Sequence, residues 1–276
     1  VEGDIAGLHA GLCIEGVEHG SSTRIVLREG LPAASGETLS RAVELTLYVR
    51  DRTPAVRFLS NAYVLPRTGD IAIPVESVNL PEAEFELRRM TDRNIIRARQ
   101  DGLLGLPVYA WTTDYLDASF AEVVWSGTAA LGQDLNRDVT TRVPLAEMLA
   151  GQPAGVYLAT AQVPGADPYE TPPASQWFIL TDLGLATYLG TDGLTVAVRG
   201  LTDAAARNGV AVSLYSEGNA LLGEAASDDQ GVVHFEAGLT RGTGAARPAL
   251  VVARMGDDLA YLSLADAAID LSDRGV

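Results

Sequence analysis

The residues in this sequence best suited to do chemistry are Cys13-Ile14-Glu15-Gly16. A Cys-Xaa-Glu-Gln tetrapeptide closes an internal thioester between its thiol and the side-chain carbonyl of its glutamine. Gly16 stands at the glutamine position and has no side-chain carbonyl, so no thioester can form. Leu12 and Ile14 flank Cys13, and this apolar setting predicts a buried, unreactive thiol. Because the chain has one cysteine, an internal disulfide and a cysteine cluster for zinc or iron–sulfur are excluded.

A second segment of interest is Ser227-Asp228-Asp229-Gln230-Gly231, which resembles part of a calcium loop. It lacks the alternating oxygen ligands and the distal bidentate glutamate of an EF-hand. Strand-forming residues flank it, so the sequence predicts a hairpin turn between strands at 221–226 and 232–235. The histidines are scattered along the chain: His9, His19 and His234. We therefore assign no metal-binding and no cofactor-binding residue.

Carboxylates are abundant, and three of them alternate along one predicted strand as Glu82, Glu84 and Glu86. This spacing predicts a solvent-exposed face of a sheet. A glycosidase needs two carboxylates facing each other across a cleft, and no spacing here indicates that arrangement. No Gly-x-Ser-x-Gly elbow, phosphate-binding loop or His-Glu-x-x-His helix occurs in the sequence. We assign no catalytic residue and expect no enzyme; a carboxylate-pair enzyme is the least favoured alternative.

Aromatic side chains offer a different chemistry, a platform on which sugars stack. The candidates are Trp111, Trp125 and Trp177, together with Tyr109 and Tyr115. Trp177 alternates with an isoleucine in a predicted strand, which favours core packing. Trp111 lies in a predicted loop over residues 111–115, where exposure is more credible. The aromatics therefore support a sugar site only weakly.

Composition describes an acidic globular protein. Of 276 residues, 47% are hydrophobic and 20% charged, and the net charge is -16 with no lysine. Nucleic acid and anionic membrane surfaces both select concentrated positive charge, so we expect neither as a partner. Negative charge of this size favours solubility. The first residues carry no initiator methionine and no signal-peptide pattern, and we expect the chain to be part of a longer polypeptide.

The elements that would position these residues are mostly strands. In Val43 to Arg50, aliphatic and polar residues alternate, which predicts a strand with one buried and one wet face. Residues 82–88, 194–198 and 210–214 repeat the pattern, and turn-forming residues separate such runs. Helical periodicity is scarce.

Two short segments have helical character. Pro144 to Ala150 and Thr202 to Arg207 each predict one or two turns of helix. Neither is long enough to cover a sheet.

Many short strands with almost no helix predict an all-β chain of tandem antiparallel β-sandwiches, of the fibronectin III or immunoglobulin-like kind. We place a partial domain at 1–53, because Arg50 to Pro54 separates two strands and 53 residues are too few for a sandwich. A full sandwich follows at 54–183 and another at 184–276. Residues 164–173, rich in proline, predict a long loop before the last strand of the middle domain, at 176–181.

Several segments together resemble the bacterial alpha-2-macroglobulins. The strongest is Gln176-Trp177-Phe178-Ile179-Leu180-Thr181-Asp182-Leu183-Gly184-Leu185, followed by Thr191 to Val198 and Gly209 to Leu214. In that family such a block opens the macroglobulin-like domain equivalent to the second one of the vertebrate proteins. The remaining matches keep the family's order: residues 12–20 through 43–45, 74–79, 88–94 and 235–275.

The resemblance implies a large secreted or periplasmic protein, often lipid-anchored, that traps proteases after they cut a bait segment. We therefore expect a non-catalytic scaffold part of a protease-trapping inhibitor, in the periplasm or cell envelope. Its expected partners are target proteases, met through the full-length protein, and neighbouring domains of the same chain, with no membrane contact by this part. The alternative is a carbohydrate-binding or adhesive β-sandwich module.

Overall fold

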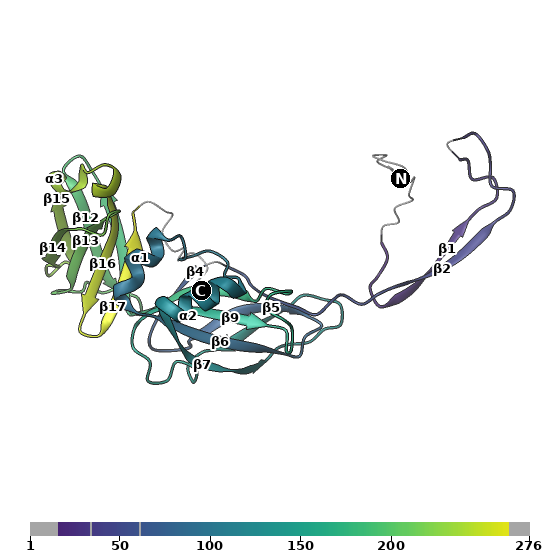
Figure 1. The fold of residues 1–276 in the computed structure, drawn as a ribbon, viewed down its shortest axis with the longest axis horizontal. Helices are drawn as coiled ribbons and strands as arrows, with labels where there is room; N and C mark the ends of the chain where they lie inside the picture. The colour runs from purple at the N-terminus through teal and green to yellow at the C-terminus, as the bar shows by residue number, and fades with distance from the viewer. Residues whose placement is uncertain (1–15, 34, 61, 265–276) are drawn as a thin grey trace.

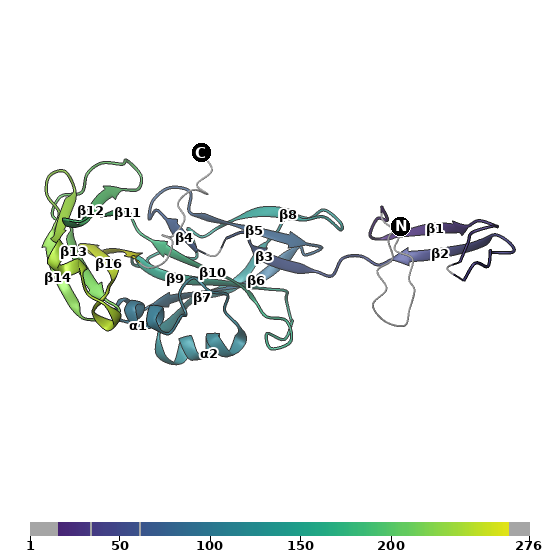
Figure 2. The same cartoon turned by 90° about the horizontal axis from the view of Figure 1, so that it is seen from above.

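The computed structural model describes residues 16–33, 35–60 and 62–264, which are folded mostly as strands (Figures 1 and 2). Three parts follow one another: a two-stranded ribbon, a middle sandwich and a C-terminal sandwich. This confirms the predicted all-β class of antiparallel β-sandwiches. One pair departs from the antiparallel rule, because β4 (Ala62–Leu65) runs parallel to β10 (Ala174–Leu180) at a sheet edge.

The two-stranded ribbon consists of β1 (Ser21–Leu27) and β2 (Val43–Val49), paired so that Ile25 faces Leu45. It projects from the middle sandwich (Figure 2). The prediction of a strand over Val43–Val49 is confirmed, but the prediction that its aliphatic face is buried is wrong. Leu45 and Leu47 are 45% and 52% exposed. Two strands alone cannot enclose an apolar face, and no second layer of described residues covers this one.

The exposure of this face predicts that its side chains contribute little to the stability of the chain. We expect Leu47→Thr to change the free energy of unfolding by less than about 0.5 kcal/mol, as for surface substitutions in general. The matched control is Leu87→Thr, at a fully buried leucine of β6 (Glu82–Met90), which should cost several-fold more. Urea unfolding followed by circular dichroism measures both. A large loss for Leu47→Thr would mean that the face is covered in solution.

The middle sandwich packs a five-stranded sheet, in the order β4-β10-β9-β6-β7, against a three-stranded sheet in the order β3-β5-β8. Residues 163–173 form the loop between β9 and β10, as the sequence predicts. The other strands are β3 (Ala55–Phe58), β5 (Ala72–Val78), β6 (Glu82–Met90), β7 (Ala121–Ala130), β8 (Val139–Pro144) and β9 (Gly155–Gln162).

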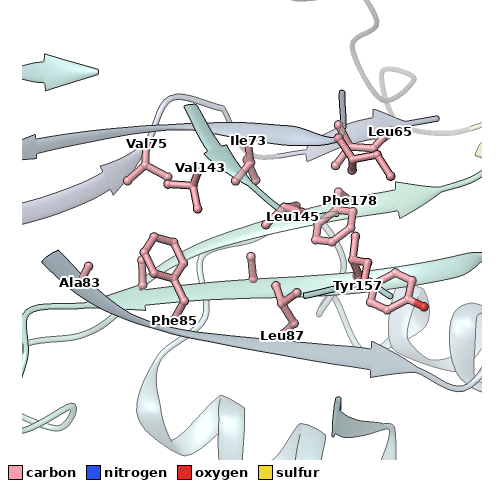
Figure 3. Close-up of a cluster of buried hydrophobic side chains, with 14 of the residues drawn as sticks. Leu65, Ile73, Val75, Ala83, Phe85, Leu87, Val143, Leu145, Tyr157 and Phe178 are labelled. Atoms are coloured by element: carbon pink, nitrogen blue, oxygen red, sulfur yellow. The ribbon is translucent and has the colours of Figure 1, made fainter. Parts of the chain in front are cut away.

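The core of the middle sandwich lies between these two sheets (Figure 3). Phe85 and Leu87 project into it from β6, and both are fully buried, as the alternation in that strand predicts. Tyr157 of β9 stacks on Phe178 of β10 with ring centroids 5.3 Å apart. Burial raises the pKa of Tyr157 to about 12, and its hydroxyl donates a hydrogen bond to the carbonyl of Pro153.

The C-terminal sandwich packs the sheet β11-β12-β15 against the sheet β14-β13-β16-β17. Leu194, Val196 and Val198 point into its core and are buried, which confirms the alternation predicted there. Its strands are β11 (Leu183–Leu189), β12 (Gly193–Gly200), β13 (Ala211–Ser216), β14 (Leu221–Ala226), β15 (Val232–Glu236), β16 (Pro248–Met255) and β17 (Asp258–Ser263).

Helices are few, but they are not where the sequence pattern placed them. α1 (Ile95–Gln100) and α2 (Ala110–Ser119) lie on the outer face of the five-stranded sheet (Figure 2), so the predicted loop over residues 111–115 was wrong. The segments at 144–150 and 202–207 form turns, not helices, and Ala204 adopts a left-handed φ of 55° that breaks a helix. The remaining helical pieces are single turns: Asp92–Asn94, α3 (Ala237–Thr240) and Gly244–Ala246.

Candidate functional site at the interface between the sandwiches

The motifs with predicted chemistry do not assemble into a reactive site. Cys13 lies outside the described residues. Ser227 to Gly231 forms a turn in which Asp228 Oδ1 accepts hydrogen bonds from the backbone N–H groups of Gln230 and Val232, at 3.0 and 2.8 Å. It is not a hairpin turn, because β14 and β15 belong to different sheets. Across the residues that the structure describes, no group of three His, Cys, Asp or Glu side chains is placed to hold a metal.

The three tryptophans are separated. Trp177 is only 4% exposed, which confirms its predicted place in the core, and Trp125 packs partly buried against the middle core. Trp111 is 66% exposed on α2, where it stacks on Tyr109 with a centroid distance of 6.2 Å and an interplanar angle of 5°. A platform of three indoles is therefore not formed.

The alternating carboxylates of β6 lie on the outer face of its sheet, but their neighbour Arg88 alters their chemistry. Arg88 is 5% exposed and pairs with Glu86 at 2.7 Å and with Asp117 of α2 at 2.8 Å. Burial opposes its charge, yet the hydrogen bond to Asp117 and the charge of Glu86 outweigh burial and raise the pKa of Arg88. Glu86 and Asp117 thus neutralise a buried cation, which is a structural task.

The most extensive feature outside the two sandwich cores is a third apolar core between the sandwiches. From the middle sandwich it takes Phe120, Leu158 and Trp177, among others, and from the C-terminal sandwich Leu250 and Val252 of β16. All are buried, with at most 4% of each side chain exposed. Burying a side chain of this size stabilises by about 1.5–3 kcal/mol. An interface so apolar favours a fixed angle between the two domains.

Strand β16 can serve two cores because it is apolar on both faces. Val251 and Ala253 point into the core of the C-terminal sandwich, whereas Leu250 and Val252 point into the shared core. The whole run from Ala249 to Ala253 is buried. Alternation places successive side chains on opposite faces, so an unbroken apolar run in an antiparallel strand signals burial on both sides.

A network of hydrogen bonds centred on Asp258 fixes the two-residue connection between β10 and β11. Asp258, 8% exposed, accepts hydrogen bonds from the hydroxyl of Thr181 at 2.7 Å and from the backbone N–H of Asp182 at 2.9 Å. It also accepts from the N–H of Leu259 at 2.8 Å, while Thr181 Oγ1 accepts from the N–H of Leu183. Three of these bonds involve Thr181, Asp182 or Leu183, so the backbone of the connection has little freedom to rotate.

Ion pairs surround the shared core. Arg99 of α1 and Arg247 both contact Glu217, at 2.7 and 2.8 Å, and Arg67 contacts Asp257 at 3.0 Å. The hydrogen bonds from Arg99 and then Arg247 hold the pKa of Glu217 below its ordinary value of 4.5. The Arg99–Glu217 and Arg67–Asp257 ion pairs each join the middle sandwich to the C-terminal sandwich.

The lowered pKa of Glu217 predicts an acid-sensitive interface. A carboxylate with a depressed pKa in the folded state contributes stability that is present above 4.5 and is lost as pH falls through the folded pKa. We expect the wild type to lose more stability than Glu217→Gln between about pH 6 and about pH 3. Urea unfolding across this range measures the difference. Glu236→Gln, at an exposed carboxylate of β15, is the control and should follow the wild type.

A separate clamp holds the linker that leads from the ribbon to the middle sandwich. Asn79 and Asn136 adopt left-handed φ values of 49° and 63°, which asparagine tolerates better than most residues. Their amides bind both backbone groups of Arg52: Asn79 Nδ2 donates to its carbonyl at 2.7 Å, and Asn136 Oδ1 accepts from its N–H at 2.8 Å. The Arg52 guanidinium pairs with Asp138 at 2.9 Å and lowers the pKa of that carboxyl.

Comparison with known families agrees with this architecture. The family model described as "Bacterial alpha-2 macroglobulin MG2 domain" matches residues 57–178. The family model described as "Bacterial alpha-2-macroglobulin MG3 domain" matches residues 180–276. The two matches are adjacent and together leave only the first 56 residues and residue 179 unmatched. The chain belongs to the bacterial alpha-2-macroglobulin family.

Individual relatives are similar over most of the chain. Alpha-2-macroglobulin of Escherichia coli K12 is 27% identical over 249 residues, which are 90% of this chain and 14% of that protein. A crystal structure of the native E. coli protein spanning domains MG0-NIE-MG1 aligns with a TM-score of 0.64 at 26% identity, over 90% of this chain and 76% of that one. A crystal structure of the trypsin-activated E. coli protein aligns with a TM-score of 0.62 at 27% identity. The alignment covers 79% of this chain and 14% of that one.

This chain therefore spans about one seventh of its E. coli relative. The equivalence of residues 184–276 with the second vertebrate domain, and the division at 53/54 and 183/184, stay predictions. The sequence analysis did not predict the shared core. The unbroken apolar run of β16 is the feature of the sequence that could have indicated it.

Proposed function

We propose that this chain is a rigid, non-catalytic scaffold within a protease-trapping inhibitor. The shared core carries the proposal, because it joins two sandwiches into one unit that can hold a fixed angle inside a larger assembly. The membership in the alpha-2-macroglobulin family and the existence of a trypsin-activated relative support a protease as the partner. Bait cleavage and capture would belong to other parts of the full-length protein.

The residues of the chain support a scaffold over an enzyme. Cys13-Ile14-Glu15-Gly16 lacks the glutamine of a thioester, and the buried cation Arg88 uses the carboxylates nearest to it. The proposed location is the periplasm or cell envelope, and the strong negative charge suits a soluble part of such a protein. No helix in the described part of the chain has the length and apolar character needed to cross a membrane.

The test compares the 276-residue chain with the full-length protein from the same organism. Each is incubated with trypsin, and residual activity is read on a large protein substrate and on a small chromogenic one. We expect the full-length protein to block only the large substrate, and the chain alone to block neither. Stoichiometric inhibition by the chain alone would contradict the scaffold role, and no inhibition by the full-length protein would contradict the trap.

Covalent capture is tested separately by intact mass spectrometry of the full-length protein before and after methylamine treatment. Methylamine opens a thioester and adds its own mass. Uptake would place a live thioester outside this chain, whereas no uptake would leave steric confinement as the trapping mechanism.

A further inference from the structure

The outer surface around α2 combines exposed aromatic rings with a polar cavity. Trp111 and Tyr109 are 66% and 48% exposed, and Leu106, three residues before Tyr109 in the sequence, is 57% exposed. Trp111 and Asp114 lie three residues apart on α2, so they are neighbours on one face of the helix. Asp114 lines a cavity of about 240 Å³ between α2, the five-stranded sheet and the 163–173 loop. Ala110, which lies between Tyr109 and Trp111 in the sequence, also lines this cavity, so the aromatic pair flanks a residue of the cavity wall.

The cavity offers mainly hydrogen-bond acceptors. Its walls include the carboxylates of Glu84, Glu86 and Asp114. Arg88 also lines it, but its donors are directed to Asp117, Thr160 and Glu86. Two other donors are likewise engaged: Tyr169 donates to Asp114 at 2.6 Å, and the Gln162 amide donates to the carbonyl of Ala166.

The charge of this surface is one-sided. The stretches 101–136 and 143–198, which contain α2 and the 163–173 loop, have no arginine, lysine or histidine. The cation that lines the cavity, Arg88, is already matched by Glu86 and Asp117. A ligand that complements this surface is therefore positively charged and rich in donors, and it carries an apolar part for the aromatic rings. Sugars need donors as well as acceptors from a site, and this cavity offers few free donors.

We propose that the α2 surface, formed by Leu106, Tyr109, Trp111, Asp114, Glu84 and Glu86, binds a basic segment of a partner protein. An arginine of the partner enters the cavity, where the carboxylates accept its N–H donors. A neighbouring cationic or apolar side chain packs on the open face of Trp111. The surface is polar at its centre and aromatic at its rim, so binding depends on both charge and the indole.

The test uses a short fluorescent peptide in which arginine and leucine alternate, with citrulline in place of arginine as its neutral counterpart. Anisotropy titration of the 276-residue chain measures the dissociation constant. We expect binding of the arginine peptide, no binding of the citrulline peptide, and weakening as NaCl concentration rises. Trp111→Ala should weaken binding about threefold. The isosteric pair Glu84→Gln with Asp114→Asn should weaken it about fivefold.

Matched controls separate a site from general attraction to an acidic protein. Tyr188→Ala removes a 65% exposed aromatic from β11, and Asp192→Asn with Glu236→Gln removes two charges from the C-terminal sandwich. Both should bind the peptide as the wild type does. The proposal would be overturned if Asp192→Asn with Glu236→Gln weakened peptide binding as much as Glu84→Gln with Asp114→Asn does. It would also be overturned if Trp111→Ala left peptide binding unchanged. Trp111-dependent binding of chitooligosaccharides without binding of the arginine peptide would overturn it in favour of a sugar site.

Discussion

Replacing Leu250 and Val252 together with alanine uncouples the two sandwiches, so that one cooperative unfolding transition becomes two. Both side chains point out of their own sandwich into the shared core, and both are almost fully buried. Truncating two such side chains costs about 4 kcal/mol, because the apolar contact is lost and a cavity remains. The loss falls on the interface, since neither residue belongs to the core of the C-terminal sandwich.

The control deletes the same atoms from the other face of the same sheet. Leu214→Ala with Val251→Ala removes one leucine and one valine side chain from the core of the C-terminal sandwich, where both are fully buried. This variant should destabilise the C-terminal sandwich while the interface remains intact. Differential scanning calorimetry counts the transitions, and the fluorescence of Trp177, which lies in the shared core, reports separation.

The outcome also bears on the proposed function. If the variant with Leu250→Ala and Val252→Ala melts in a single transition at the wild-type temperature, the sandwiches are not joined by this core. The proposal that they form one rigid unit is then wrong. If it melts in two, the same pair of substitutions in the full-length protein tests whether a fixed angle between these domains is needed for trapping. Because neither side chain is exposed, a loss of trapping would point to domain geometry.

The sequence predicted strands well where one face is wet and the other meets a core. Phe85 and Leu87 of β6 and Val196 of β12 lie where their alternation put them. The same reasoning failed for Leu45 and Leu47, because alternation records that a face is apolar and not that a layer covers it.

Elements held by tertiary contacts were missed. α2 has no side-chain cap and no clear apolar stripe, and it is stabilised by burying Thr112 and Leu116 against its neighbours. The turn at Ser227 to Gly231 was recognised as a turn, but local residues cannot say whether the next strand stays in the same sheet.

The interface was hidden for a related reason. Sequence reasoning assigned apolar residues to the nearest sandwich core, and a strand such as β16, apolar on both faces, simply looks like a strong strand. Other members of the shared core, such as Trp177 of β10 and Phe120 after α2, lie far from β16 in the sequence. An unbroken apolar run in an otherwise alternating protein marks such a second interface, and β10 shows the same pattern in Trp177 to Leu180.

Replacing Asp258 with alanine should be the most damaging single substitution at the connection between the sandwiches. Its carboxylate accepts from Thr181 Oγ1 and from the N–H groups of Asp182 and Leu259, at 2.7 to 2.9 Å. Alanine leaves these three donors without their acceptor in a buried place, and we expect a cost of about 3 kcal/mol. The free energy of unfolding is measured by urea denaturation, and amide hydrogen exchange at Asp182 reports local opening.

Two variants make this expectation specific. Asp258→Asn keeps one acceptor oxygen and the shape of the side chain, so it should lose about 1 kcal/mol. Asp228→Ala removes another aspartate that accepts from two backbone N–H groups, but in an exposed turn within the C-terminal sandwich. It should leave exchange at Asp182 unchanged. If Asp258→Ala lowered the free energy of unfolding without faster amide exchange at Asp182, the expectation would be wrong. The carboxylate would then stabilise β17 alone, and the connection would be held rigid by the shared core.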